Sequence, residues 1–133
     1  MSDNHEAIQA GVFLSAETLT NACHGAAYRA GWWHDLQTGA DLRGKRNFGE
    51  LIALCHSELS EALEAHRKNK MDDHLPHRKG AEVELADTVI RIFDLAGGYG
   101  FDLGSAIAEK LAYNAHRLDH RRENRAKDDG KQY

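Results

Sequence analysis

The sequence has little of what marks several classes of protein. It has 133 residues, of which one is proline and two are cysteine. Cys23 and Cys55 are far apart and form no C-x-x-C pair, which argues against a disulfide scaffold or a zinc knuckle and favours reduced thiols of a cytosolic protein. No apolar run reaches the roughly 20 residues of a membrane helix, and the first residues lack the order of a signal peptide. We therefore expect a cytoplasmic protein without a membrane partner.

The chain also lacks an excess of positive charge. The chain carries 17 Lys and Arg against 21 Asp and Glu, a formal net charge of -4. Dedicated nucleic-acid-binding domains show a clear basic excess, so we expect no such role. The basic stretch "RLDHRRENRAK" near the C-terminus is interpreted as a solvated tail.

The apolar residues that are present follow a helical spacing. They predict an all-α antiparallel bundle of about four helices in a single domain of residues 1–133, with flexible tails at 1–13 and 119–133. Ser15, Asn47 and Asp102 are expected N-caps, and Gly97, Gly98 and Gly100 are expected to end the third helix. The predicted helices run from Ser15 to about Gly31, from Asn47 to about Lys68, over about 81–96, and from Asp102 to about Arg117.

Acidic residues lie beside the apolar stripe of two of these helices. In "HSELSEALEAHR", Glu58 and Glu61 lie at the edge of the stripe, whereas Glu64 points outward. The third helix is mostly apolar, yet it carries one narrow charged stripe. That stripe consists of Glu84, Asp87, Arg91 and Asp94.

If these two helices pack antiparallel with the acids facing each other, four carboxylates converge. Two charges about 6 Å apart repel by roughly 3 kcal/mol at an effective dielectric of about 20, so the site must take up protons or cations. All-oxygen ligands favour Mg²⁺ or Mn²⁺. The predicted metal ligands are Glu58, Glu61, Glu84 and Asp87. The alternative is that each pair is an ordinary solvated helical face, on which acids three residues apart are common.

Two motifs together resemble a known family. E-x-x-E at Glu58 and Glu61 is followed by E-x-x-D at Glu84 and Asp87, with 22 residues between Glu61 and Glu84. The later stretch "GFDLGSAIAEKLAYNAHR" contains K-x-x-x-N-x-x-R. Over about residues 30–118 the chain resembles the MazG-like all-α nucleoside triphosphate pyrophosphohydrolases.

The resemblance implies a homodimer or homotetramer that cleaves a nucleoside triphosphate into its monophosphate and pyrophosphate, as nucleotide house-cleaning. It implies Mg²⁺, with Mn²⁺ as an alternative, on the four acids, and Glu58 or Glu61 as the residue that orients the attacking water. It places Lys110, Asn114 and Arg117 near the phosphates or the sugar. Without the resemblance, these three residues read equally well as a solvated helical face.

The nucleobase of such a substrate needs a contact of its own, because the acids, Lys110, Asn114 and Arg117 account only for the phosphates and the sugar. Trp32 and Trp33 are adjacent in a glycine-rich loop, and we expect one of them, preferably Trp33, to stack on the nucleobase. Both could instead cover the end of the bundle. Asn47 precedes a helix N-terminus, which can bind an anion, or it serves only as the cap. Asp94 contacts a ligand or pairs with Arg91.

Three other functions compete with this one. A pyrimidine-selective dUTP or dCTP hydrolase of the same fold fits the same motifs. A di-iron carboxylate bundle is disfavoured, because neither Glu58 nor Glu84 is followed by histidine at the third position. A non-catalytic helical module, for metal binding or interaction, remains as an alternative of another class.

Overall fold

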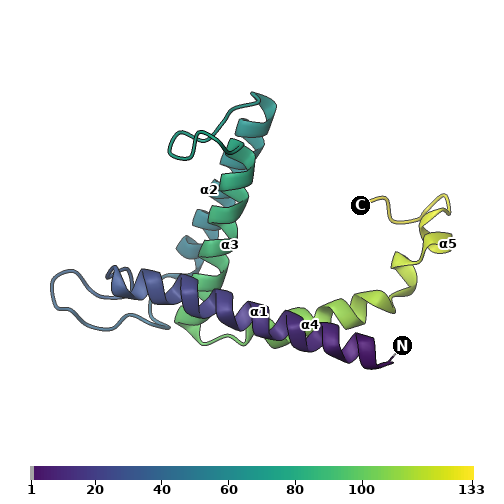
Figure 1. The fold of residues 1–133 in the computed structure, drawn as a ribbon, viewed down its shortest axis with the longest axis horizontal. Coiled ribbons are helices and arrows are strands. Elements are labelled where there is room, and N and C mark those ends of the chain that lie inside the picture. Colours follow the sequence, from purple (N-terminus) through teal and green to yellow (C-terminus); the bar gives the residue numbers. More distant parts are fainter. Residues whose placement is uncertain (1) are drawn as a thin grey trace. The chain divides into compact units, whose positions relative to one another are not determined.

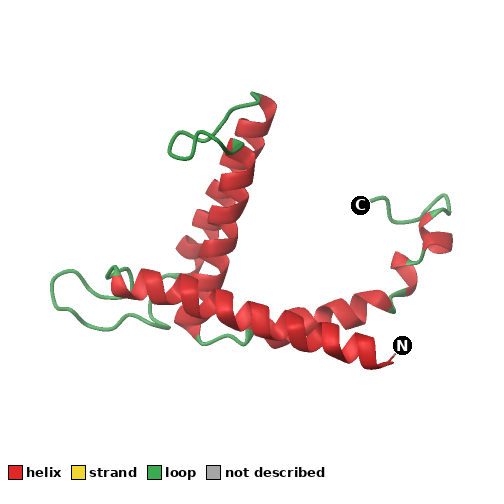
Figure 2. Ribbon diagram, viewed as in Figure 1, coloured by secondary structure: helices red, strands yellow, loops and turns green. Residues whose placement is uncertain are grey.

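The computed structural model describes residues 2–133, in which helices are joined by loops (Figure 2). Within this range the extended pairing is limited to two isolated β-bridges, which confirms the predicted all-α class. No described helix is long and apolar enough to cross a membrane. The elements are α1 (Ser2–Arg29), α2 (Phe48–Arg67), α3 (Gly80–Tyr99), α4 (Leu103–Ala115), the 3-10 helix η1 (Leu118–His120) and α5 (Arg122–Arg125).

Two predicted caps are present. The side chain of Asn47 accepts a hydrogen bond from the backbone N–H of Glu50 at 3.1 Å, and it begins α2. Asp102 accepts one from the N–H of Ser105, also at 3.1 Å, and it begins α4. Each cap satisfies an N–H that has no partner inside its helix.

Two predicted boundaries differ from the structure. Helix α1 begins at Ser2 instead of after Ser15, because no proline interrupts the segment before Ser15 and a potential cap residue can also lie inside a helix. Helix α3 continues beyond the predicted end at 96 and stops at Gly100, which has the left-handed φ of 69°. Residues 2–13 are therefore part of α1, and the segment after 119 contains the short helix α5.

The chain divides into two compact units, which are described separately. One unit is Thr18–Phe101, and the other comprises the start of α1, up to Glu17, and Asp102–Tyr133. Helix α1 contributes to both units. All the predicted acidic ligands lie in the unit Thr18–Phe101.

In the unit Thr18–Phe101, α2 and α3 form an antiparallel hairpin and run side by side in Figure 1. Arg91 of α3 contacts Glu58 in the middle of α2. Nearer the hairpin loop, Gly80 lies so close to Ala65 that a β-carbon on it would be 3.0 Å from that of Ala65. The contacts thus run in opposite directions along the two helices. This antiparallel packing is what the convergence of the predicted acids requires.

The core of this unit forms around one tryptophan. Trp33 is fully buried and packs with Leu51 of α2 and Leu95 of α3. Its ring fills the space beside Gly98, where any larger residue would collide with it. The loop between α1 and α2 is thereby anchored to the hairpin.

The other unit pairs the start of α1 with α4. The Gln9 side chain donates to the carbonyl of Ala108 at 3.4 Å. A β-carbon on Gly104 would be 3.2 Å from the Phe13 ring and 3.3 Å from Ala16. The absence of a side chain at Gly104 thus allows close approach of the two helices.

Candidate functional site

Three acidic side chains converge between α2 and α3. Glu58 comes from α2, and Glu84 and Asp87 come from consecutive turns of α3. One carboxylate oxygen of each lies within 4.8 Å of the others. The antiparallel packing thus brings together three of the four predicted ligands.

The fourth predicted ligand, Glu61, lies at the border of this group. Its side chain is exposed, and it is outside the set of mutually close oxygens. It is nevertheless near enough for its charge to affect the pKa of Glu84. Glu61 therefore lies exposed at the border of the cluster.

The cluster lacks sufficient positive charge. Burial, together with Glu58 and Glu61, raises the pKa of Glu84 to about 7. Burial and the charge of Glu58 also raise the pKa of Asp87. The Oε2 atom of Glu84 is buried and has no hydrogen-bond partner among the described residues. Without a cation, Glu84 therefore binds a proton more readily than an ordinary glutamate.

Arg91 holds Glu58 in place. The Oε1 atom of Glu58 accepts a hydrogen bond from Nε of Arg91 at 2.9 Å and forms an ion pair with its Nη2, also at 2.9 Å. Burial alone would raise the pKa of Glu58, but its hydrogen bonds with Glu84 and Arg91 lower it below the ordinary value. The alternative pairing of Arg91 with Asp94 is not the one observed.

The donor set fits a hard divalent cation. It consists of carboxylate oxygens only, and one of them, Oε2 of Glu84, is buried without a partner. Mg²⁺ and Mn²⁺ favour such ligands. A cation would also lower these pKa values, since it offsets the repulsion among the acids.

A cavity of about 500 Å³ opens beside the cluster. This volume is within the range of roughly 300–1,000 Å³ that is typical of small-molecule sites. Glu58, Asp87 and Arg91 make part of its wall polar, and α1 contributes small apolar residues. The complete lining is Cys23, Ala26, Ala27, Ala30, Trp32, Arg46, Leu51, Leu54, Glu58, Asp87, Ile90, Arg91, Asp94 and Leu95.

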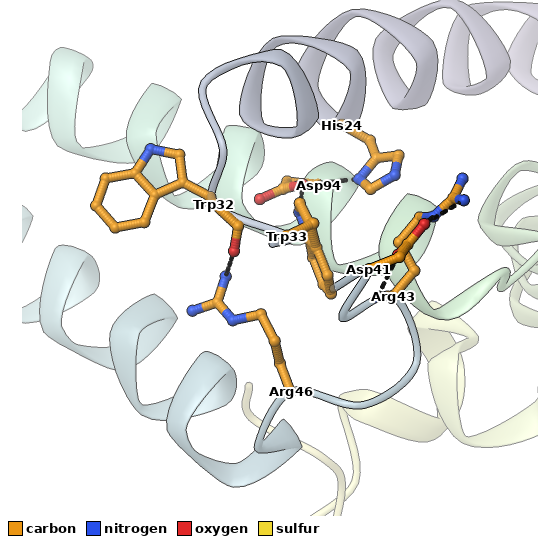
Figure 3. A network of polar contacts seen from close by, with 7 residues as sticks. All are labelled: His24, Trp32, Trp33, Asp41, Arg43, Arg46 and Asp94. Atoms are coloured by element: carbon orange, nitrogen blue, oxygen red, sulfur yellow. Dashed lines mark hydrogen bonds and ion pairs between the residues drawn. The ribbon is translucent and has the colours of Figure 1, made fainter. Parts of the chain in front are cut away.

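The two tryptophans exchange the roles that the sequence suggested. Trp33 is 0% exposed, so the preference for Trp33 as the stacking residue is wrong for this arrangement. Its indole N–H donates to Oδ1 of Asp94 at 2.8 Å, which satisfies the polar atom of a buried ring. Trp32 is 67% exposed and lines the cavity. Figure 3 shows the two rings directed to different sides of the loop.

Two site residues were not predicted from the sequence. His24 of α1 donates from Nδ1 to Oδ1 of Asp94 at 3.0 Å. Arg46 lines the cavity, donates to the carbonyl of Trp32 at 3.3 Å, and lies 5.2 Å from the Trp33 ring centroid (Figure 3). Arg46 directly precedes Asn47, whose position before a helix N-terminus pointed to this region, but no local pattern indicates His24, which is 70 residues from Asp94.

Asn47 serves as the cap of α2, since its side-chain oxygen is engaged by Glu50 N–H. It is not among the residues lining the described cavity. The capping alternative therefore accounts for this residue, and direct contact with substrate has no support here.

The predicted phosphate-binding residues belong to the other unit. The Lys110 ammonium lies 4.6 Å from the Tyr113 ring centroid, and the Arg117 guanidinium lies 5.8 Å from it. Arg117 also pairs with Asp119 at 2.6 Å. The Oδ1 atom of Asn114 is buried without a partner among the described residues. Lys110 and Arg117 thus both lie near the Tyr113 ring, but α4 ends at Ala115, so Arg117 is outside the helix on which it was expected.

The unit Thr18–Phe101 therefore combines an acid cluster, a cavity and an exposed indole at the cavity wall. Such a site can hold an anionic ligand through a divalent cation and an aromatic ligand through stacking. Comparisons of the chain with protein-family models, with curated proteins and with solved structures found no match.

Proposed function

We propose that the protein is a Mg²⁺-dependent nucleoside triphosphate pyrophosphohydrolase of the MazG-like type. It converts a nucleoside or deoxynucleoside triphosphate into the monophosphate and pyrophosphate, and so removes unwanted nucleotides. The observation that carries the proposal is the convergence of Glu58, Glu84 and Asp87 beside a cavity that Trp32 also lines. The spacing of the two acidic motifs supports it independently.

The acids have separate tasks in this reaction. Glu84 and Asp87, with Glu58, would hold the cation, which offsets the triphosphate charge and makes water a better nucleophile when bound. Glu58, oriented by Arg91, or Glu61 takes the proton of the attacking water. Water adds to a phosphorus of the α,β-anhydride, the bond from that phosphorus to the bridging oxygen breaks, and the monophosphate and pyrophosphate separate.

The organic part of the substrate is held at the rest of the cavity. Trp32 presents an exposed ring there, and Ala27, Leu51 and Leu54 form apolar wall. Base–aromatic stacking contributes about 1–3 kcal/mol and tolerates several bases. Trp32 thus supplies affinity, whereas a polar group must choose the base.

Product analysis tests the proposal. The chain is incubated with a panel of canonical and modified triphosphates with Mg²⁺, with Mn²⁺ and with chelator, and products are separated by chromatography. We expect monophosphate and pyrophosphate with either metal and no turnover with chelator. Diphosphate plus orthophosphate would contradict the bond assignment. Inactivity with every triphosphate would favour a non-catalytic helical module.

Variants of the acid cluster test the ligand assignment. Glu61→Gln, Glu84→Gln and Asp87→Asn should abolish turnover while the helical circular-dichroism signal remains. Glu64→Gln is the matched control, because Glu64 lies on α2 but pairs with Lys68 at 2.5 Å, outside the cluster. Full turnover of the Glu84 variant with Mg²⁺ would refute the assignment.

A further inference from the structure

Asp94 is held in one orientation by two donors. His24 Nδ1 and Trp33 Nε1 both donate to its Oδ1 atom, at 3.0 and 2.8 Å. His24 packs edge-on against Trp33, with ring centroids 5.3 Å apart. Because one donor is on a fully buried ring, the carboxylate cannot turn without losing a buried hydrogen bond.

The second oxygen of Asp94 has no such role. Among the described residues, the hydrogen bonds to this carboxylate end on Oδ1. The side chain is 19% exposed and lines the cavity. Figure 3 shows the other oxygen directed away from His24, on the side of the view where Trp32 lies. Asp94 thus presents a fixed hydrogen-bond acceptor to the cavity.

Asp94 is also separate from the metal cluster. It follows Asp87 by seven residues, which corresponds to about 10 Å along a helix at 1.5 Å per residue. It is not among the three acids whose oxygens converge. Two acids of α3 therefore line the cavity at different heights along the helix, Asp87 near Glu58 and Asp94 about two turns further on. In the proposed function, the acids near Glu58 face the phosphates of the substrate.

We infer that Asp94 reads the nucleobase by accepting a hydrogen bond from an exocyclic amino group, so that the substrate class is triphosphates of amino-bearing bases. This inference rests on the proposed function, because it assumes a nucleotide in the cavity. An ionised carboxylate has no proton to donate. It therefore attracts the amino group of cytosine, adenine or guanine and repels the carbonyl that uracil or hypoxanthine has instead.

Matched nucleotide pairs test the inference. The pairs dCTP/dUTP, dATP/dITP and dGTP/dITP change or remove one amino group each. We expect the amino member of at least one pair to have a kcat/KM about tenfold or more higher, as for a hydrogen bond to a charged group. Calorimetry with the corresponding monophosphates, without metal, should show the same preference in Kd. Equal values within all three pairs would overturn the inference.

A near-isosteric variant makes the test sharper. In Asp94→Asn, His24 and Trp33 keep the amide oxygen on their side, so that the amide NH₂ takes the place of Oδ2. In the dCTP/dUTP and dATP/dITP pairs, the preference should then reverse toward the member with the carbonyl. Glu82→Gln is the control, since Glu82 is an exposed acid of α3 that pairs with Arg78, and it should leave the preference unchanged.

The possible outcomes separate this inference from the proposed function. A wild-type preference that persists in Asp94→Asn would overturn the role of Asp94. If the variant fails to fold, the comparison of the three nucleotide pairs with the wild-type protein alone decides whether the inference holds. Discrimination among monophosphates without hydrolysis of any triphosphate would support the base-reading role and refute the pyrophosphohydrolase. Absence of any nucleotide binding would overturn both.

Discussion

Glu84 and Asp94 are both acids of α3, but their surroundings differ. Asp94 accepts two hydrogen bonds, from His24 and Trp33. Glu84 has an unpartnered oxygen and faces other carboxylates, so that its pKa rises to about 7. Glu84 must therefore respond to pH and to cations, whereas Asp94 is fixed in its orientation.

The raised pKa of Glu84 predicts how pH affects stability. Between the ordinary value of 4.5 and about 7, the metal-free folded chain binds more protons than the unfolded chain, so its free energy of unfolding falls as pH rises through this range. Glu84→Gln removes the charge and should stabilise the metal-free protein at pH 8. The gain should be much smaller at pH 5.

Urea unfolding in chelator at the two pH values measures this effect. Mg²⁺ at pH 8 should stabilise the wild type more than Glu84→Gln, because only the wild type has the complete ligand set. The exposed Glu64→Gln should show no comparable dependence on pH. A Glu84 variant that is less stable than the wild type at pH 8 in chelator would contradict the prediction.

Alanine substitution of the two tryptophans should affect different properties, stability for Trp33 and substrate binding for Trp32. Trp33→Ala removes a fully buried ring and should cost about 3–5 kcal/mol of unfolding free energy. Trp32→Ala should leave the unfolding midpoint nearly unchanged and raise KM, with a loss of about 1–3 kcal/mol if the ring stacks on the base. Steady-state kinetics and thermal unfolding measure both effects. If Trp32→Ala keeps the wild-type KM, the base is held elsewhere.

At the scale of the element, the end of α3 is decided by packing. Gly97 and Gly98 remain helical, although glycine is a poor helix former. Gly98 lies directly against the ring of Trp33, and Gly97 lies against His24. The cost of glycine in a helix is therefore offset by the close approach of the loop and of α1.

This packing predicts an unusual effect of alanine. In most helix interiors Gly→Ala stabilises by about 0.5–1 kcal/mol, and Gly11→Ala in α1 should do so, because nothing lies within 4 Å of its new β-carbon. Gly98→Ala should instead destabilise by about 1–3 kcal/mol through overpacking against Trp33. Denaturant unfolding of the two variants compares the effects. Stabilisation by Gly98→Ala would show that Trp33 can move away.

The element boundaries show which signals are local. Asn47 and Asp102 were identified as caps because capping depends on the residue and the next turn only. The start of α1 was misplaced at Ser15, because a capping residue type does not by itself end a helix. The glycines of α3 have the composition of a stop signal, but contacts from distant residues keep Gly97 and Gly98 in the helix.

At the scale of the whole molecule, apolar side chains of α2 and α3 remain uncovered. They form one row on each helix, with spacing i, i+4 on α2 and i, i+4, i+7 on α3. Each of these side chains is more than a third exposed. They are Leu59 and Leu63 on α2, and Leu85, Val89 and Ile92 on α3. We propose that these rows are covered in a homodimer or homotetramer, as contiguous apolar surface of this kind usually marks an interface.

Light scattering at micromolar concentration tests this proposal. The wild type should have the mass of a dimer or tetramer, and the double variant Leu63→Glu with Val89→Glu should shift toward the monomer. Leu36→Glu is the control, because Leu36 is almost fully exposed in a loop outside these rows. A wild-type monomer would refute the oligomer.

The sequence by itself determined the helical class, two helix caps and the acids that converge. Each depends on short-range rules: a period of 3.6 residues, a side chain bonded to the next turn, and acids three residues apart on one face. The tertiary structure alone decided that Trp33 is buried and Trp32 exposed, that Arg91 binds Glu58, and that Glu61 lies at the border. It also brought His24 to Asp94 across 70 residues. These choices depend on which distant side chains compete for the same space and the same hydrogen bonds, and no local pattern encodes that competition.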